Sequence, residues 1–391
     1  MITGAIRADS KGGTGGESPI TRVRLAVRDC LRRHPPGGRP ILVACSGGAD
    51  SLALAVAAGQ CRHASGTGLV TVDHGLQPGS AERAEQVTAW ARAQGLEPAV
   101  AVAVDVAGLP GGPEAAARTA RYRALAAVAE RIGAAAVLLG QTREDQAETV
   151  LLALARGAGP RGLSGMPERR VRHGVVFLRP LLDVGRAQTR AVCAELGLTP
   201  WVDPHNTDPR FARARVRAAL PVLADLLGPD VVANLARTAK LLACDTAALD
   251  GLAATERAKI ERTDPGHADP GLAVDRLAEL VDAIRTRVLH AWVRSLGVPG
   301  GALAHRHIVA LDALVTSWRG QGPVWLPGGI AVGRRAGWLV RWPASASEPL
   351  PAEPLAPEPS PAAPVGTSSP VVSLGESQDT SPTWSALSKE D

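Results

Sequence analysis

The sequence predicts an α/β fold with a doubly wound, mainly parallel sheet, followed by a smaller and mostly helical C-terminal domain. Short apolar runs alternate with longer helical segments between residues 41 and 156, as they do in sheets whose parallel strands are joined by helices. The region from about 220 to 317 is mostly helical in character. A length of 391 residues is sufficient for two folded units.

Each element of the α/β part follows from its local pattern. The expected strands are apolar runs that end in polar or turn residues, at 41–45, 69–73, 99–105 and 135–140. The expected helices lie between and after them, at about 50–58, 80–94, 113–131 and 144–156. The Gly-rich segment 157–165 should be a loop. Two late apolar runs, 324–332 and 337–341, could pair as strands.

Composition divides the chain into four parts. Residues 1–19 are rich in Gly, Ser and Thr, and residues 343–391 in Pro, Ser, Ala and Glu, so both ends should be disordered. The α/β part, 20–220, and the mostly helical part, 221–342, lie between them. Ligands of a doubly wound sheet bind at the C-terminal ends of its strands, so the site should belong to the α/β part.

Charge and cysteine content narrow the class of protein. The formal net charge is +5, and all but four of the 43 basic residues are Arg, which binds phosphate in a fork geometry. This fits a nucleic-acid partner, although the Arg, Ala, Gly and Pro content fits a GC-rich genome equally well. The five Cys form no Cys-x-x-Cys pair, which argues against zinc and iron–sulfur sites. No run of about 18 apolar residues and no secretory signal is visible, so we expect a cytoplasmic protein with no membrane span.

The most specific motif follows the first expected strand, where Ser46-Gly47-Gly48-Ala49-Asp50-Ser51 leads into a helix. The two glycines let a phosphate approach the backbone, the helix N-terminus adds its dipole, and the serine hydroxyls can donate hydrogen bonds. An Asp beside so much phosphate charge is consistent with Mg²⁺. The chain lacks the Gly-x-x-x-x-Gly-Lys-Ser/Thr loop of kinases and motor ATPases.

This motif resembles the PP-loop of the ATP pyrophosphatase superfamily. The resemblance implies that the loop holds the pyrophosphate end of ATP, so that the α-phosphate is attacked and an adenylated carbonyl or amide forms. It assigns ATP contacts to Ser46, Gly47, Gly48, Ala49, Asp50 and Ser51, and makes Asp50 the expected Mg²⁺ ligand.

Further segments resemble motifs of the tRNA(Ile)-lysidine synthase family, at their usual places in the order. Asp73-His74-Gly75 ends the second strand, and Gly140 ends the fourth. The resemblance implies that Asp73, His74 and Gly140 contact the nucleotide.

The segment that begins at Gly140 also contains a pair of carboxylates. Asp145 and Glu148 lie three residues apart on one face of the expected helix, in Asp145-Gln-Ala-Glu148-Thr149. Such a pair could take a lysine ammonium or Mg²⁺. With Asp50, these two are the expected catalytic residues.

Several arginines complete the resemblance. Arg118 and Arg121 share a helix face in an Arg-x-x-Arg-Tyr pattern, and Arg156 belongs to an Arg-Gly-x-Gly segment. Arg213, Arg215 and Arg217 alternate, so a strand would put all three on one face and a helix would put Arg213 and Arg217 together. The arginines expected to contact RNA or other phosphate are Arg118, Arg121, Arg156, Arg213 and Arg217.

The chain departs from the family pattern at three positions. Gln141 stands where the family has His, and Gln cannot transfer a proton near neutral pH. Glu144 stands in place of an Asp, and Ala214 in place of an Asn. We therefore expect Gln141 and Glu144 only to line the site.

The resemblance covers about residues 22–342, is strongest up to 220, and implies a carbon–nitrogen ligase. O2 of the wobble cytidine, in the CAU anticodon of a minor isoleucine tRNA, would attack the α-phosphate of ATP. The ε-amine of free L-lysine would then attack C2 and release AMP, and the product, lysidine, changes decoding from AUG to AUA. The expected cofactors are ATP and Mg²⁺. Residues 20–220 would form the PP-loop catalytic domain and 221–342 the tRNA-binding domain, and the chain could form a homodimer.

Three other functions stay open on the sequence. A tRNA 2-thiolase would use cysteines or a cluster, which the cysteine pattern disfavours. An amidoligase such as NAD synthetase shares the loop but lacks the Asp-Gln-x-Glu-Thr and Arg-Gly-x-Gly segments. A weakly active RNA-binding relative would fit the changes at Gln141, Glu144 and Ala214.

Overall fold

The computed structural model describes residues 18–61, 65–75, 77, 79–105, 112–203, 208–262 and 270–342. Most of the two ends expected to be disordered, 1–17 and 343–391, lies outside these residues. Pro19, which the composition assigned to the disordered start, is the first residue of helix α1 (Pro19–Arg33). Proline is favoured at this position because the first helical N–H has no partner within the helix.

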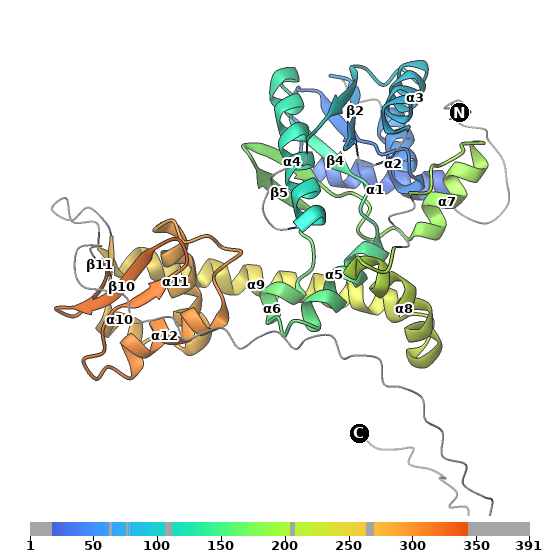
Figure 1. Ribbon diagram of the computed structural model, residues 1–391. Coiled ribbons are helices and arrows are strands. Elements are labelled where there is room, and N and C mark those ends of the chain that lie inside the picture. The colour runs from blue at the N-terminus through green and yellow to red at the C-terminus, as the bar shows by residue number, and fades with distance from the viewer. Residues whose placement is uncertain are drawn as a thin grey trace, which may run out of the picture. The chain divides into compact units, whose positions relative to one another are not determined.

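A six-stranded sheet forms the centre of the α/β part (Figure 1). Its strands are β1 (Ile41–Ala44), β2 (Thr67–Asp73), β3 (Ala99–Ala103), β4 (Ala136–Leu139), β5 (Arg169–Arg172) and β6 (Val175–Leu178). The spatial order is β3-β2-β1-β4-β6-β5, and every pairing is parallel except that of β5 with β6. The predicted mainly parallel sheet is therefore confirmed.

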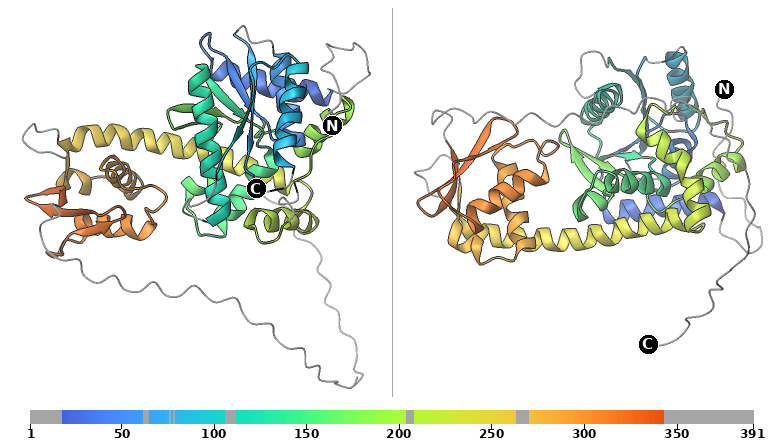
Figure 2. Two further views of the ribbon diagram at one scale, coloured as in Figure 1. Left: turned by 45° about the horizontal axis from the view of Figure 1, so that its top comes forward. Right: turned by 60° about the horizontal axis from the view of Figure 1, so that its bottom comes forward.

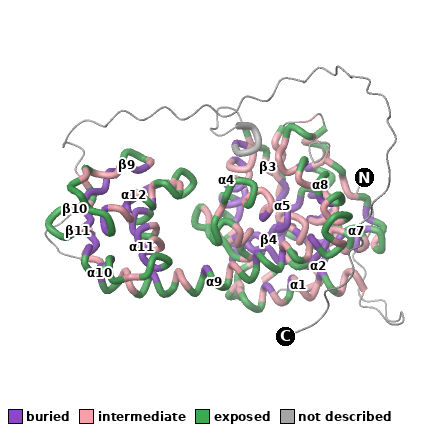
Figure 3. The backbone as a smooth tube through the Cα atoms, turned by 90° about the horizontal axis from the view of Figure 1, so that it is seen from below, coloured by how far each residue is buried: buried purple, intermediate pink, exposed green. Residues whose placement is uncertain are grey.

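Alternate residues of the central strand face opposite sides of the sheet, and both sides are buried. Ile41 and Val43 pack with α1, α2 (Ala49–Gln60), α3 (Ser80–Ala93) and α7 (Arg186–Glu195). Leu42 packs on the other side with α4 (Gly112–Ile132). A strand buried on both faces needs a continuous apolar run, which explains why residues 41–44 contain no polar side chain. Figure 3 shows the buried residues concentrated in these layers.

The helix after β4, α5 (Arg143–Leu154), is followed by a segment that the sequence did not predict correctly. Residues 157–165 were expected to be a loop, yet they contain the short helix α6 (Pro160–Leu163). The Leu163 and Ser164 amides donate to the carbonyls of Gly159 and Pro160, which closes the turn. Pro160 preorganises the first helical position, and this outweighs the glycine content of the segment.

Two long helices, α8 (Ala212–Leu227) and α9 (Val231–Ile260), come next. Of the two arrangements considered for residues 213–217, the structure has the helix. Within the part of the chain that the structure describes, no single helix has the length and apolar character to cross a membrane. Only α8 and α9 taken together, with a bend of 101° between them, meet such a test.

The C-terminal region combines helices with a second sheet (Figure 2). Its helices after α9 are α10 (Val274–Ala278), α11 (Asp282–Ser295) and α12 (His305–Thr316), and its five strands, in spatial order, are β7 (Glu261–Arg262), β8 (Gly271–Ala273), β11 (Trp338–Trp342), β10 (Ile330–Arg335) and β9 (Val324–Leu326). The run 324–332 is thus two strands joined by a turn, because Gly328 and Gly329 both have positive φ. Trp292 is fully buried at the centre of this core, where its Nε1 donates to the Pro270 carbonyl at 2.8 Å.

Candidate active site

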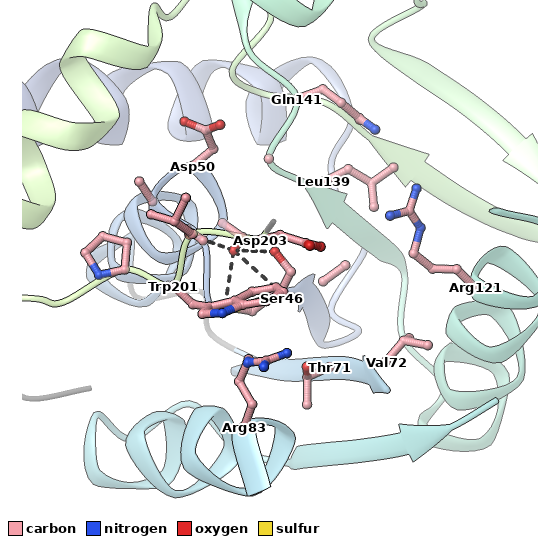
Figure 4. A pocket seen from close by; sticks show the side chains of 18 of the residues that line it. Ser46, Asp50, Thr71, Val72, Arg83, Arg121, Leu139, Gln141, Trp201 and Asp203 are labelled. Atoms are coloured by element: carbon pink, nitrogen blue, oxygen red, sulfur yellow. Dashed lines mark hydrogen bonds between the residues drawn. The ribbon is translucent and has the colours of Figure 1, made fainter. Parts of the chain in front are cut away.

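A cavity of about 780 Å³ lies at the C-terminal ends of β1, β2 and β4. This is where ligands of a doubly wound sheet are expected. Figure 4 shows the labelled side chains of Ser46, Asp50, Arg121 and Gln141 around this space. The residues predicted to bind ATP that line it are Ser46, Gly48, Ala49, Asp50, Ser51, Asp73, His74 and Gly140.

The loop after β1 is held by its own hydrogen bonds. The Ser51 hydroxyl donates to the Gly48 carbonyl at 2.9 Å and accepts from the Ser46 amide at 3.2 Å. Gly47 has φ +81°, which a residue with a side chain rarely adopts, and its carbonyl accepts from the Trp201 amide at 2.9 Å. Helix α2 begins directly after Gly48, so its N-terminus faces the cavity and can stabilise an anion there.

Asp50, in the first turn of α2, is oriented by α7. One carboxylate oxygen accepts from the Thr189 hydroxyl at 2.5 Å, and the other lies 3.9 Å from Arg186 Nε. Burial raises the pKa of Asp50, while the hydrogen bond from Thr189 opposes this and the charge of Asp145 adds to it. Thr189 has no exposed surface, so this contact is fixed.

The two carboxylates predicted on one face of α5 are together in the structure, and two arginines neutralise them. Arg186 Nη2 donates to Asp145 at 2.5 Å and to Glu148 at 2.9 Å. Arg217 Nε donates to Glu148 at 2.9 Å. Asp145 also accepts from the backbone and side chain of Thr142, at 2.9 and 3.1 Å, which caps α5. Asp145, Glu148, Arg186 and Arg217 therefore form one network of two acidic and two basic side chains, and Asp50 borders it through Arg186.

Arg186 and Thr189 were not found by sequence reasoning. They lie in the first turn of α7, in a segment with no recognised motif, and reach the site only because α7 packs against α2. The Arg186 amide also donates to Glu144 at 2.9 Å, which ties the start of α7 to the start of α5. Glu144 was expected only to line the site, and in the structure its carboxylate holds this junction.

Asp73 and His74, at the end of β2, both line the cavity. Burial would raise the pKa of Asp73, but the Gly75 amide, which donates to it at 2.9 Å, helps to hold the pKa below its ordinary value. Burial, together with the charge of Arg121, lowers the pKa of His74. The Nδ1 of His74 is buried and has no hydrogen-bond partner among the described residues, so a ligand in the cavity could supply one.

Gly140 provides close contact between the end of β4 and the start of α2. A Cβ at this position would lie 3.1 Å from the carbonyl carbon and oxygen of Asp50 and 3.2 Å from the Cα of Ser51. The next residue, Gln141, has a buried side-chain oxygen with no partner among the described residues. Gly140 thus sets the position of the loop, and Gln141 offers an acceptor to the cavity.

Arginines gather around Tyr122, on the α4 side of the sheet. Arg118 and Arg172 lie over its ring at 5.1 and 4.6 Å, and Arg179 Nη2 donates to its hydroxyl at 3.3 Å. Arg179 is 1% exposed. Burial, together with the nearby charges of Arg121, Arg213 and Arg179, lowers the pKa of Arg118 to about 10. This arginine cluster, Arg118, Arg121, Arg172, Arg179 and Arg213, has the charge of an anion site.

Of the arginines predicted to contact phosphate, Arg121 and Arg217 line the cavity, whereas Arg118, Arg156 and Arg213 do not. Arg156 is exposed beyond the end of α5 and is not among the described residues that line it. Arg215 is exposed and donates to the carbonyls of Pro209 and Arg210. Both point to solvent in this structure.

One wall of the cavity was not predicted as part of the site. The guanidinium carbon of Arg83 lies 3.6 Å from the centre of the Trp201 ring (Figure 4). Gln77 donates to Asp203 at 2.9 Å. Trp201 and Asp203 lie in the segment between α7 and α8. Arg83 stands in α3 and carries no sequence signal of its own.

Comparison with known proteins supports one family. The model of the PP-loop domain matches residues 23–223, and that of the TilS substrate binding domain matches residues 272–340. The tRNA(Ile)-lysidine synthase of Salinispora tropica is 62% identical over 325 residues, which are 82% of this chain and 96% of that protein. That of Thermobifida fusca is 50% identical over 330 residues, 84% of this chain and 98% of that protein.

Among solved structures, a U34-tRNA thiolase from Methanococcus maripaludis with a 4Fe-4S cluster is 18% identical, with a TM-score of 0.47, and the match covers 57% of this chain and 80% of that chain. The curated relatives, at 62% and 50% identity, favour lysidine synthesis over the thiolase, amidoligase and RNA-binding alternatives. By these relatives and by both domain matches, the chain belongs to the tRNA(Ile)-lysidine synthase family of PP-loop ligases.

Proposed function

We propose that the chain joins L-lysine to the wobble cytidine of a minor isoleucine tRNA in two steps that share one cavity. The observation that carries this proposal is that the PP-loop and Asp145 line the same space. A carbonyl activated by adenylation is then formed within reach of the second nucleophile. Such proximity replaces a collision between free reactants and supplies much of the rate.

ATP use is a property of the family, and the loop supports it. For Mg²⁺, the described residues contain no group of three or more His, Cys, Asp and Glu side chains that could hold a metal ion by themselves. Asp50 would therefore supply one ligand, and phosphate oxygens and water the others, as is usual for Mg²⁺ at nucleotide sites. The ion would neutralise charge on the phosphate oxygens.

In the first step, cytidine O2 bonds to the α-phosphorus, and the bond from that phosphorus to the bridging oxygen breaks. Pyrophosphate leaves with the electron pair. The backbone amides at the start of α2 and the Ser46 hydroxyl would stabilise the charge of this leaving group. The Ser51 hydroxyl is directed at Gly48, so its part is to hold the loop.

In the second step, the ε-amine of lysine bonds to C2, loses a proton, and displaces AMP together with the former O2. The acidic network of Asp145 and Glu148 would hold the amino acid. Because Arg186 is paired with both Asp145 and Glu148, the network favours the protonated, unreactive form of an amine less strongly than two isolated carboxylates would.

The arginine cluster around Tyr122 would bind the phosphates of the tRNA near the cavity. Arg121 and Tyr122 line the cavity itself, so the cluster continues into the reaction space. Charge-assisted bonds from Arg to phosphate are strong, and their number sets the salt dependence of RNA binding. The C-terminal domain would contact the same tRNA elsewhere, as the match to a substrate-binding domain supports.

The proposal is tested by the transfer of radiolabelled lysine to a minor isoleucine tRNA that carries a CAU anticodon. The reaction contains ATP and Mg²⁺, and the enzyme is wild type, Asp50→Ala or the control Asp183→Ala, which replaces an exposed carboxylate paired with Lys240. We expect labelling by wild type and by the control, and none by Asp50→Ala. Absence of labelling by folded wild type that binds ATP would refute lysidine synthesis.

A further inference from the structure

Every oxygen of the two carboxylates proposed to hold lysine already accepts a hydrogen bond. Glu148 is fully buried: its Oε1 accepts from both Arg186 and Arg217 at 2.9 Å, and its Oε2 accepts from Arg217 at 3.3 Å. Asp145 Oδ1 accepts from Arg186 and lies 3.6 Å from Arg217 Nη2, while Oδ2 accepts from Thr142. A lysine ammonium cannot reach Glu148 while both arginines stay in place.

The two arginines are not held equally. The Arg186 side chain is 15% exposed, contacts three carboxylates, and starts α7 with its amide bound to Glu144. The Arg217 side chain is 34% exposed, and among the described residues its ion pairs are with Asp145 and Glu148. If Arg217 leaves, Glu148 keeps Arg186, so the buried charge is not left unpaired, which would be costly. Of the two arginines, Arg217 is therefore the one that can leave the carboxylates at the lower energetic cost.

We infer that, in the protein without RNA, Arg217 occupies the place that the ammonium group of L-lysine takes during the reaction. This rests on the proposed function. The ammonium group of lysine carries one positive charge, as the guanidinium of Arg217 does, and has three N–H donors for the carboxylates. It would use Glu148 Oε2 and Asp145 Oδ1, the oxygens that Arg217 vacates, while Arg186 remains as the fixed cation.

RNA supplies the alternative partner for Arg217. Arg213 precedes it by one turn of α8, and residues four apart lie on the same helix face. The charge of Arg213 acts on Arg118 and Arg121, which places it at the arginine cluster. Arg121 and Arg217 both line the cavity, so a phosphate bound by the cluster at the cavity would attract Arg217. Binding of tRNA thus draws Arg217 from the carboxylates and opens the lysine site, so tRNA binds before lysine.

The expected effect is large enough to measure. A site open in about one molecule in ten binds its ligand about ten-fold more weakly than an open one. We expect tRNA to strengthen lysine binding by at least about ten-fold, and Arg217→Ala to do the same without tRNA. Arg215→Ala is the matched control, because Arg215 lies on the same helix but donates to backbone carbonyls.

The experiment is equilibrium dialysis of radiolabelled L-lysine against the full chain, without ATP, with and without a tRNA transcript carrying the CAU anticodon. The inference predicts weak binding by wild type and Arg215→Ala alone, and tight binding by wild type with tRNA and by Arg217→Ala alone. Equal lysine affinity of wild type with and without tRNA would overturn it, and this comparison needs no variant. A folded Arg217→Ala variant that binds lysine as weakly as wild type would also overturn the inference.

The transfer assay separates failure of this inference from failure of the proposed function. Wild type that transfers lysine to tRNA but binds lysine independently of tRNA removes the inference alone. Wild type that neither binds nor transfers lysine under any of these conditions removes both.

Discussion

Replacement of Gly140 by alanine tests the claim that the end of β4 sets the position of the nucleotide loop. The added methyl group would lie 3.1 Å from two backbone atoms of Asp50 and 3.2 Å from the Cα of Ser51, whereas ordinary contacts are 3.4–4 Å. The neighbours are backbone atoms of the first turn of α2, so they cannot rotate away. The loop must therefore move by about 0.3 Å or more, and such overpacking typically costs about 1–3 kcal/mol.

The assay pairs pyrophosphate exchange with thermal unfolding. A site has to hold its geometry to about 0.5 Å, so we expect kcat/KM for ATP to fall roughly 10- to 100-fold. The melting temperature should fall by about 2–4 °C for each kcal/mol lost. Gly251→Ala is the matched control: the position is an exposed helical one where an added Cβ would meet no heavy atom within 4 Å beyond its own helix turn and chain neighbours. Alanine should stabilise it by up to about 1 kcal/mol. A Gly140→Ala enzyme within two-fold of wild type would refute the reasoning.

Three further predictions follow from single contacts. Gln141→Met removes a buried acceptor that has no partner among the described residues, so it should raise the free energy of unfolding by about 1 kcal/mol and slow lysine transfer. A more stable variant with unchanged transfer would show that Gln141 does not contact substrate. Arg121→Gln should weaken tRNA binding and reduce the slope of log affinity against log salt by about 1, with the exposed Arg123→Gln as control; an unchanged slope would remove Arg121 from the phosphate contacts. Burial would raise the pKa of Glu168, but hydrogen bonds from Arg33 and His34 lower this pKa below its ordinary value of 4.5. The ionised Glu168 therefore stabilises the fold above pH 4.5, and this stabilisation is lost as the pH falls through the lowered pKa. Glu168→Gln should therefore lower the melting temperature at pH 7 and converge with wild type in acid, and a constant difference across this range would contradict the ion pair.

The sequence allowed the sheet and its loop to be predicted because both depend on local residue types. Residues 41–44 must be apolar to be buried on both faces, and glycine is strongly favoured at Gly47 because its φ is positive. The edge strand β5 was missed because Arg169, Arg170 and Arg172 leave it with one apolar residue, and its faces are largely exposed. Its strand character comes from pairing with β6 and from the turn at His173 and Gly174, which both have positive φ.

Site residues that belong to a sequence motif were predicted, and those that reach the site through tertiary contacts were missed. Asp145 and Glu148 were recognised as a pair, but their bonding to Arg186 and Arg217 could not be, because the arginines lie 38 or more residues away in the chain. The same holds for Thr189, which contacts Asp50 across 139 residues. The roles carried over from the family to the arginines differ in outcome: Arg118, Arg121 and Arg213 lie together, and Arg156 lies apart in the structure.

The most direct test of the account is mass analysis of the wobble nucleoside after incubation of the enzyme with the unmodified tRNA, ATP, Mg²⁺ and isotopically heavy lysine. The account predicts a cytidine derivative that has gained one lysine and lost one water, with the heavy label retained and one AMP and one pyrophosphate formed for each nucleoside changed. An unmodified cytidine, or a product that carries sulfur or lacks the label, would contradict it.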